Sequence, residues 1–277
     1  MPVVTPTLAL IVFGAGAVAG SLGALLGIGG GIFLVPFLNL ALNFPFTAAA
    51  AISLTTVIAT SSTVSATRTG TQLVNLRLAM ALEVATVGGS LLGGVTAQLF
   101  SQSTLQELFG VTAALVAIVM VGRLGRRNVI LDPSADPGVL GGRFHEDESR
   151  GVVTYQVKRL PVALFASFVA GNLSSLLGVG GGVINVPALN AWCGVPLRAA
   201  AATSAFMIGV TATGGAVIYY GHGQLIPPLA ASAVLGVQLG SWSGMRIGAK
   251  APVKWLKVLM AVILLVLSAL MLIRGSR

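Results

Sequence analysis

The sequence predicts an all-α polytopic membrane protein made of two inverted repeats, each a broken re-entrant helical hairpin followed by three transmembrane helices. The first observation behind this prediction is composition. The 277 residues are 55% hydrophobic and only 8% charged, whereas a soluble domain carries roughly 25% charged residues. The second is that several apolar runs reach the roughly 20 residues that cross a bilayer core. The third is a glycine-rich motif that occurs twice.

The motif reads GSLGALLGIGGGIFLVP at 20–36 and GNLSSLLGVGGGVINVP at 171–187, and the two copies align without a gap. An apolar run that stops at a glycine cluster and then restarts indicates a broken helix. Irregular backbone at membrane depth persists only where it is buried in protein or lines a watery cavity. Two broken helices at matching places in two halves are typical of a transporter binding site.

The first half contains one long broken block and then three spans. The block at 8–42 is too long for one ordinary span and is interrupted at 27–31. We expect the spans that follow it at 46–67, 78–100 and 105–121. A hydrophilic segment at 123–159 then holds five of the seven acidic residues, and its Pro and Gly indicate a linker.

The second half repeats this order. Its broken block covers 160–192, and we expect its spans at 199–220, 225–246 and 255–273. In the third block of each half, Gly89 and Gly93 match Gly236 and Gly240. The chain therefore divides into a first transmembrane repeat, a hydrophilic cytoplasmic linker and a second transmembrane repeat, at 1–122, 123–159 and 160–277.

The basic residues distinguish two topologies. If each broken block crosses the membrane once, the repeats are parallel and eleven of the Lys and Arg residues fall inside against five outside. If each block returns to its own side as a hairpin, the repeats are inverted and the division is fourteen to two. The positive-inside rule favours the hairpins in a multi-pass protein of the cell inner (cytoplasmic) membrane. It also explains the net charge of +9 without a nucleic-acid partner.

The glycine clusters are candidate anion sites. Without side chains, Gly29, Gly30 and Gly31, and equally Gly180, Gly181 and Gly182, let a ligand approach the main chain. The helix that restarts after each cluster exposes free N–H groups and the positive end of its dipole. The alternative is that the glycines serve tight packing alone.

Small polar residues near each break are further substrate-binding candidates. Asn39 and Asn190 follow their clusters at matching distances, and Ser53 and Ser204 follow matching alanine runs. Amides and hydroxyls can replace an anion's hydration without a fixed positive charge. The alternative is that they form hydrogen bonds between or within helices.

Glu83 is the only acidic residue placed well within an apolar segment, since Glu107 lies near the end of its span. An intramembrane carboxyl is by default a functional hypothesis, here as a proton carrier. The alternative is an interfacial ion pair with Arg77 or Arg68.

The sequence offers little material for catalysis. With two His and one Cys, it has no nucleophile–base pair, HExxH motif or Cys/His metal cluster, and no Lys and Ser or Thr follow the glycines to make a nucleotide-binding loop. We therefore expect no enzyme activity, no cofactor and no metal. Cys193 has no partner for a disulfide within the chain.

The doubled pattern, GSLGALLGIGGGIFLVPFL and GNLSSLLGVGGGVINVPAL, resembles the TauE/SafE family of membrane transporters, also called the sulfite exporter family. AATSA at 201–205 fits the family as well, whereas AAISL at 50–54 has Ile52 where the family often has Thr. The resemblance implies secondary transport of small sulfur-containing or organic anions, such as sulfite, sulfonates or sulfoacetate, usually as export. It leaves this chain's substrate and direction open.

We therefore expect a secondary active transporter that moves such an anion by alternating access, with the two breaks meeting near the membrane midplane. Its partners are the anion, the lipid bilayer and a coupling ion, H⁺ or Na⁺, and a homodimer is left open. The rival functions are a passive anion channel and an uptake permease of the same fold. A membrane-embedded enzyme or accessory subunit is a third, which lacks a catalytic constellation.

Overall fold

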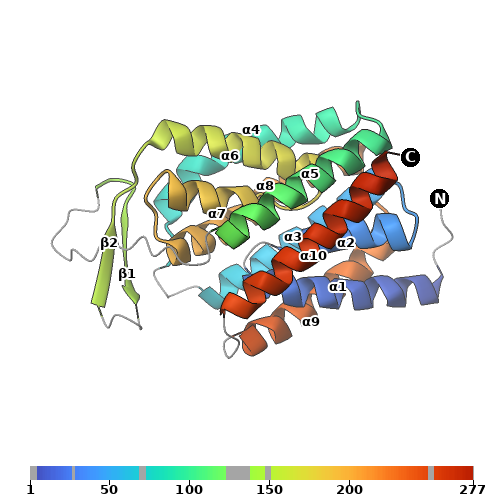
Figure 1. The fold of residues 1–277 in the computed structure, drawn as a ribbon, viewed down its shortest axis with the longest axis horizontal. Helices are drawn as coiled ribbons and strands as arrows, with labels where there is room; N and C mark the ends of the chain where they lie inside the picture. The colour runs from blue at the N-terminus through green and yellow to red at the C-terminus, as the bar shows by residue number, and fades with distance from the viewer. Residues whose placement is uncertain are drawn as a thin grey trace.

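The computed structural model describes residues 5–26, 29–68, 73–122, 138–146, 151–248 and 253–276. It is mostly helical (Figure 1). The first half consists of α1 (Pro6–Leu26), α2 (Gly31–Pro36) with a short π-helix η1 (Phe37–Ala41), α3 (Phe46–Arg68), α4 (Leu76–Ala97) and α5 (Gln102–Gly122). The second consists of α6 (Leu160–Leu177), α7 (Gly182–Ala191), α8 (Leu197–Gly221), α9 (Pro227–Gly248) and α10 (Val253–Gly275).

Five helices in the described part of the chain are long and apolar enough to cross a membrane: 6–24, 46–66, 76–97, 160–177 and 198–221. Each of the five overlaps a predicted apolar block and extends at most two residues beyond it. The protein is therefore a multi-pass helical membrane protein by the length and composition of its helices.

The two halves correspond helix by helix. From α2 onward, each helix of the second half begins 151 residues after its counterpart, as Gly31 and Gly182 or Leu76 and Pro227 illustrate. This spacing corrects one match made from the sequence. The structure pairs Gly89 with Gly240 and Gly93 with Gly244, one helical turn later than predicted.

The corrected match follows from packing. Gly89 lies against the carbonyl of Phe168 on α6, and Gly240 lies against the carbonyl of Ala17, the counterpart of Phe168, on α1. At both places a Cβ atom would overlap the neighbouring backbone. These glycines allow the close approach of helices that is common in membrane proteins.

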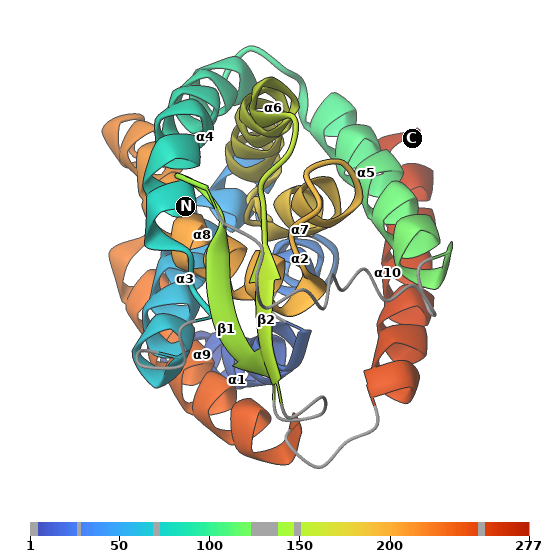
Figure 2. The ribbon, with the colours of Figure 1, turned by 90° about the vertical axis from the view of Figure 1, so that its left-hand side faces the viewer.

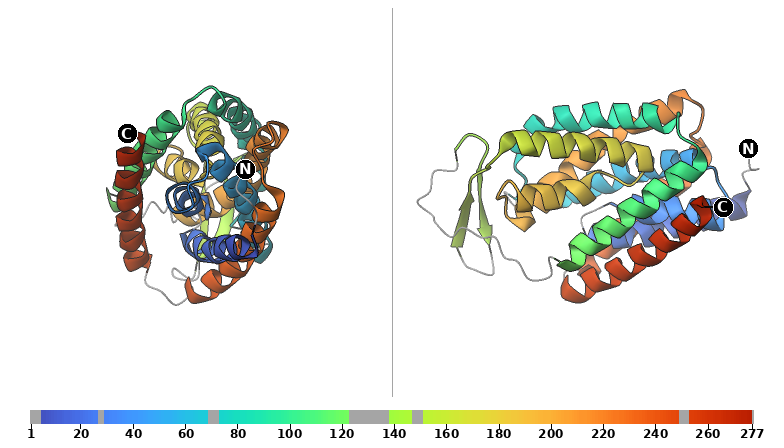
Figure 3. Two further views of the ribbon diagram at one scale, coloured as in Figure 1. Left: turned by 90° about the vertical axis from the view of Figure 1, so that its right-hand side faces the viewer. Right: turned by 45° about the horizontal axis from the view of Figure 1, so that its top comes forward.

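The helices of the two halves interlock. α1 packs against α9 and α6 against α4, while α3 packs against α8 and α5 against α10. Views along the helices show α2 and α7 surrounded by the longer helices (Figures 2 and 3). Neither half builds the core alone, and the two short helices that follow the glycine breaks lie inside it.

Two strands interrupt the predicted all-α fold. β1 (Gly142–Glu146) and β2 (Gly151–Tyr155) pair antiparallel within the predicted linker. Phe144, Val153 and Tyr155 are buried and belong to one apolar cluster with residues of α4, α6 and α8. The segment is hydrophilic on average, but alternate residues of β2 form an apolar face that composition alone conceals.

Hydrogen bonds anchor this β-hairpin to the helices. Asn75 caps α4 through Leu78 N–H at 3.0 Å, and its Nδ2 donates to Leu140 O at 2.8 Å and to the Tyr155 hydroxyl at 3.2 Å. Burial raises the pKa of the Tyr155 hydroxyl, which therefore stays protonated. The hairpin and the chain termini lie at opposite ends of the molecule (Figure 1). The rest of the linker, 123–137 and 147–150, and Gly27 of the first break lie outside the described residues.

Candidate functional site

Each glycine break reverses the chain through a left-handed backbone. Gly29 has φ +79° and its counterpart Gly180 has φ +86°, a region that residues with a Cβ atom rarely adopt. After the first break the chain folds back on α1, where a Cβ atom at Gly30 would lie 2.8 Å from the Ala19 carbonyl oxygen. Glycine is thus required both for the turn and for the close return.

The two breaks meet. A Cβ atom at Gly31, in the first break, would lie 2.6 Å from the carbonyl oxygen of Gly178, in the second. The same carbonyl accepts a 2.6 Å hydrogen bond from the Ser53 hydroxyl on α3. The structure therefore brings two predicted site residues, Gly31 and Ser53, to the second break.

The second break carries buried oxygens without hydrogen-bond partners. They are Oγ of Ser174 and Ser175 on α6, Oδ1 of Asn185 on α7 and Oγ of Ser204 on α8. All four residues are at most 2% exposed. Leaving a buried polar group unsatisfied costs about 1–3 kcal/mol, so these oxygens indicate that a polar ligand or water binds beside them.

Three of these residues lie at the second break, because Ser174 lines a pocket with Gly180, and Asn185 and Ser204 lie near the start of α7. The fourth, Ser175, places its Oγ against Gly215 of α8. A Cβ atom at Gly182 would lie 3.4 Å from Ser204 Oγ, and one at Gly181 would lie 3.7 Å from the Asn185 amide nitrogen. α7 is a ten-residue helix, so its first N–H groups have no partner within the helix. Hydroxyls, an amide and N–H groups together can hold an anion.

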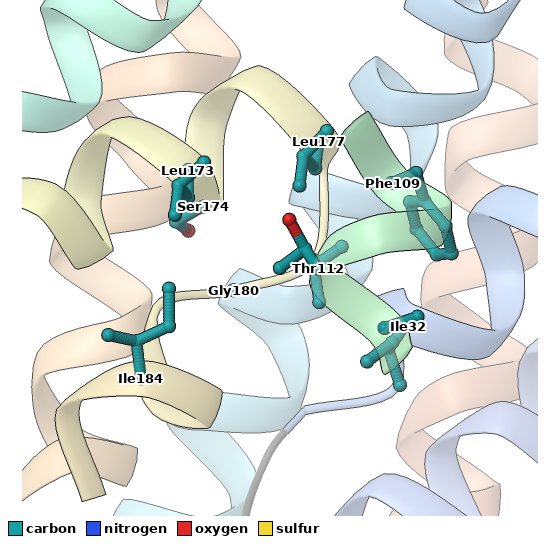
Figure 4. A pocket seen from close by; sticks show the side chains of 10 residues that line it. Ile32, Phe109, Thr112, Leu173, Ser174, Leu177, Gly180 and Ile184 are labelled. Carbon is teal, nitrogen blue, oxygen red and sulfur yellow. The ribbon is translucent and has the colours of Figure 1, made fainter. Parts of the chain in front are cut away.

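A small pocket lies against this break. It is lined by residues of both halves: Ile32, Phe109, Thr112, Ala113, Leu173, Ser174, Leu177, Val179, Gly180 and Ile184. Figure 4 shows Ser174 and Ile184 on one side and Thr112 and Ile32 on the other. A water-sized sphere can enter about 10 Å³ of it, close to what one water molecule needs. None of the lining residues is charged.

Asn39 and Asn190 lie away from the breaks. Asn39 Nδ2 donates to Phe44 O at 2.8 Å, and Asn190 Nδ2 donates to Val195 O at 2.9 Å. Gln106 Nε2 also donates to Asn39 Oδ1 at 2.8 Å. Each amide closes the turn that follows its short helix, about 12 Å beyond the break at 1.5 Å per residue. The structure thus gives both residues hydrogen bonds that hold loops, and brings neither amide to the pocket.

Glu83 lies on α4 between α6 and α8. Its Oε1 accepts a 3.0 Å hydrogen bond from the Thr211 hydroxyl, and its Oε2 is buried without a partner. In the described part of the chain no ion pair joins it to a basic residue: Arg77 is exposed, and the side chain of Arg68 is not described. The interfacial ion pair expected as the alternative is thus not seen with Arg77.

Ser174, Ser175, Asn185 and Thr211 were not among the predicted site residues. The sequence did contain a signal for three of them, because they are where the two motif copies differ. At the corresponding positions the first copy has Gly23, Ala24 and Leu34. Thr211 had no comparable signal, since its role depends on Glu83 from another helix.

The fold and this site define a class: a multi-pass helical membrane protein of two interlocked repeats whose broken helices meet beside buried hydroxyl and amide groups. The family model of the sulfite exporter TauE/SafE matches residues 12–271. The chain belongs to this family, and the resemblance seen in the doubled motif is confirmed.

Two relatives support the assignment along the whole chain. A probable membrane transporter protein, YunE of Bacillus subtilis (strain 168), is 27% identical over 94% of this chain and 96% of its own length. A probable membrane transporter protein, MJ0441 of Methanocaldococcus jannaschii, is 26% identical over 93% of both. No solved structure matches. The family and these names indicate a membrane transporter rather than an enzyme.

Proposed function

We propose that this protein is a secondary active transporter of the cytoplasmic membrane that exports a small sulfur-containing or organic anion, such as sulfite, a sulfonate or sulfoacetate, by alternating access. One observation carries the proposal: the two glycine breaks meet beside three residues with buried, unpartnered oxygens, Ser174, Asn185 and Ser204. The family supplies the substrate class.

The anion is held without a fixed positive charge. Hydroxyls of Ser174 and Ser204 and the N–H groups at the start of α7 donate to its oxygens. Rotation of the Asn185 amide presents Nδ2 in place of Oδ1, because the two ends of an amide have similar shape. With no cation in the pocket, release needs no strong ion pair to break.

Alternating access arises from two inverted repeats with re-entrant hairpins. α1 begins at the end of the molecule where α10 finishes, whereas α6 begins at the opposite end beside the β-hairpin (Figure 1). This opposed direction, together with the fold-back after each break, supports the inverted arrangement. Rocking of one repeat against the other would separate Ser53 from the Gly178 carbonyl and open the pocket.

The narrowness of the pocket favours a transporter over a channel. A sulfur oxyanion is larger than the single water molecule that fits, so the helices must move before the anion can bind or pass. α2 and α7 fill the space between the longer helices, where a continuous pore would have to run. An uptake permease would use the same site and differ only in direction.

Counterflow in proteoliposomes tests the proposal. Vesicles loaded with unlabelled sulfite, sulfoacetate or taurine should accumulate the labelled anion transiently and saturably. A channel would instead equilibrate the label without this overshoot. Absence of saturable flux for every small anion tested would refute the proposal.

A matched set of variants locates the site. Two variants replace a residue of the second half by the residue at the matching position of the first half: Asn185→Leu and Ser174→Gly. An equivalent backbone already accommodates each of these replacements. Both should weaken counterflow, while Ser232→Ala, which removes an exposed hydroxyl on α9, should leave it unchanged.

A further inference from the structure

Glu83 is a half-buried acidic group on α4, and no counter-charge lies beside it among the described residues. α4 packs against α6 and α8. α6 has no ionisable side chain, and α8 has only Arg198, Tyr219 and Tyr220. Arg198 is about 20 Å of helix away from Thr211 at 1.5 Å per residue, and the Tyr219 hydroxyl donates to Ser175 O on α6. On α4 itself, Arg77 is exposed.

The hydrogen bonding of Glu83 fits a neutral carboxylic acid in this conformation. Oε1 accepts a hydrogen bond from the Thr211 hydroxyl at 3.0 Å, and Oε2 is buried without a hydrogen-bond partner. The Thr86 hydroxyl lies beside the same side chain and donates to the Glu83 main-chain carbonyl at 3.0 Å. An ionised carboxylate away from water needs several donors or a cation, and the described residues supply two hydroxyls and no cation. The acid therefore holds a proton in this conformation.

α8 connects this acid to the second break. Thr211 and Ser204 are seven residues apart, which places them two turns apart on the same face of the helix. Ser204 faces Gly182 at the start of α7, and Thr211 faces Glu83. Ser90 on α4 donates to the Thr211 carbonyl. Any movement of α8 that opens the second break therefore also changes the surroundings of Glu83.

We propose that Glu83 carries one proton across the membrane together with each anion, an inference that rests on the transport function proposed above. The carboxylate takes the proton from water on the side where the anion enters. The acid stays neutral while both are enclosed, and it returns the proton to water on the other side. The counterpart of Glu83 in the second half is Val234, so the protein has one such site rather than two.

The test separates exchange from proton-coupled net flux in proteoliposomes. Glu83→Gln mimics the neutral acid permanently, so labelled-anion counterflow at equal pH should remain within about twofold of wild type. Accumulation driven by a pH gradient should fall at least tenfold, and so should the substrate-induced pH change seen by a dye trapped in the vesicles. Glu107→Gln, which alters an exposed carboxyl on α5, should change neither.

Three outcomes would count against the proposal in distinguishable ways. Gradient-driven accumulation that persists in Glu83→Gln overturns it. Wild-type counterflow without any response to a pH gradient also overturns it but leaves the transport function standing, whereas no counterflow at all removes the transport function first.

If Glu83→Gln does not fold, Thr211→Val replaces it. A pH profile of gradient-driven transport identical to wild type in that variant contradicts the proposal, and a shifted profile supports it.

Discussion

The two glycine breaks share a backbone but differ in what surrounds them. Gly29 and Gly180 adopt the same left-handed conformation at corresponding positions. Around the first break the side chains are apolar or satisfied, as with Leu34 and with Ser53, whose hydroxyl donates to Gly178 O. Around the second, hydroxyls and an amide oxygen are buried without partners. The duplicated scaffold thus supplies two similar turns, of which the first packs against the second, and we propose that the second binds the anion.

The largest expected effect comes from filling the contact between the breaks. Gly31→Ala places a methyl group 2.6 Å from the Gly178 carbonyl oxygen, a backbone atom that cannot turn away. We expect a loss of about 3 kcal/mol in stability, at the upper end for an overpacked core. At the counterpart position, Gly182→Ala meets the flexible end of Ile208 and should cost less than half as much. Thermal unfolding in detergent measures both, and equal losses would contradict this difference.

Next in size is the loss of either turn-closing amide. Asn39→Ala and Asn190→Ala should each cost about 2 kcal/mol, because each leaves a loop carbonyl without its donor. Here the two halves should behave alike. Protein that folds should bind the anion with unchanged apparent affinity. A raised half-saturation concentration in both variants, with normal thermal stability, would restore the original prediction that these residues bind substrate.

The sequence predicts those features of this molecule that depend on local signals, and it misses those that depend on contacts between distant residues. The broken blocks and the helices after them were predictable because apolar length and glycine clusters are local signals, although only five helices in the described part of the chain are long and apolar enough to cross a membrane. The β-hairpin was not, because its apolar face of Val153 and Tyr155 lies in a hydrophilic segment. The match of Gly89 with Gly236 was wrong by one turn, since a glycine repeat of four residues aligns equally well in two registers. The roles of Asn39 and Asn190 depend on loop carbonyls that only the fold brings near.

A smaller effect concerns affinity for the anion, which we expect to depend on the second break and not on the first. Asn185→Leu should raise the half-saturation concentration for the anion about tenfold, equivalent to about 1.4 kcal/mol, without lowering thermal stability, since it removes an unpartnered buried oxygen. The reverse change in the first half, Leu34→Asn, buries a new amide and should lower stability without altering affinity. Concentration dependence of counterflow and thermal unfolding test the pair. Equal affinity losses in both variants would show that the breaks do not differ in function.

The smallest expected effect concerns a single hydroxyl. Ser174→Gly should raise the half-saturation concentration about threefold, or roughly 0.7 kcal/mol, in line with one neutral hydrogen bond. The same counterflow assay measures it, with Ser232→Ala as the control. A change in maximal rate alone, with the half-saturation concentration unchanged, would assign Ser174 to the motion of α6 rather than to binding.

The most direct test of the difference between the breaks is an experimental density map of the protein with its transported anion bound. The account predicts density for one anion at the second break, within hydrogen-bonding distance of Ser174 or Ser204, of Asn185 and of the first N–H groups of α7. Density at the first break beside Gly23 and Leu34 would contradict it.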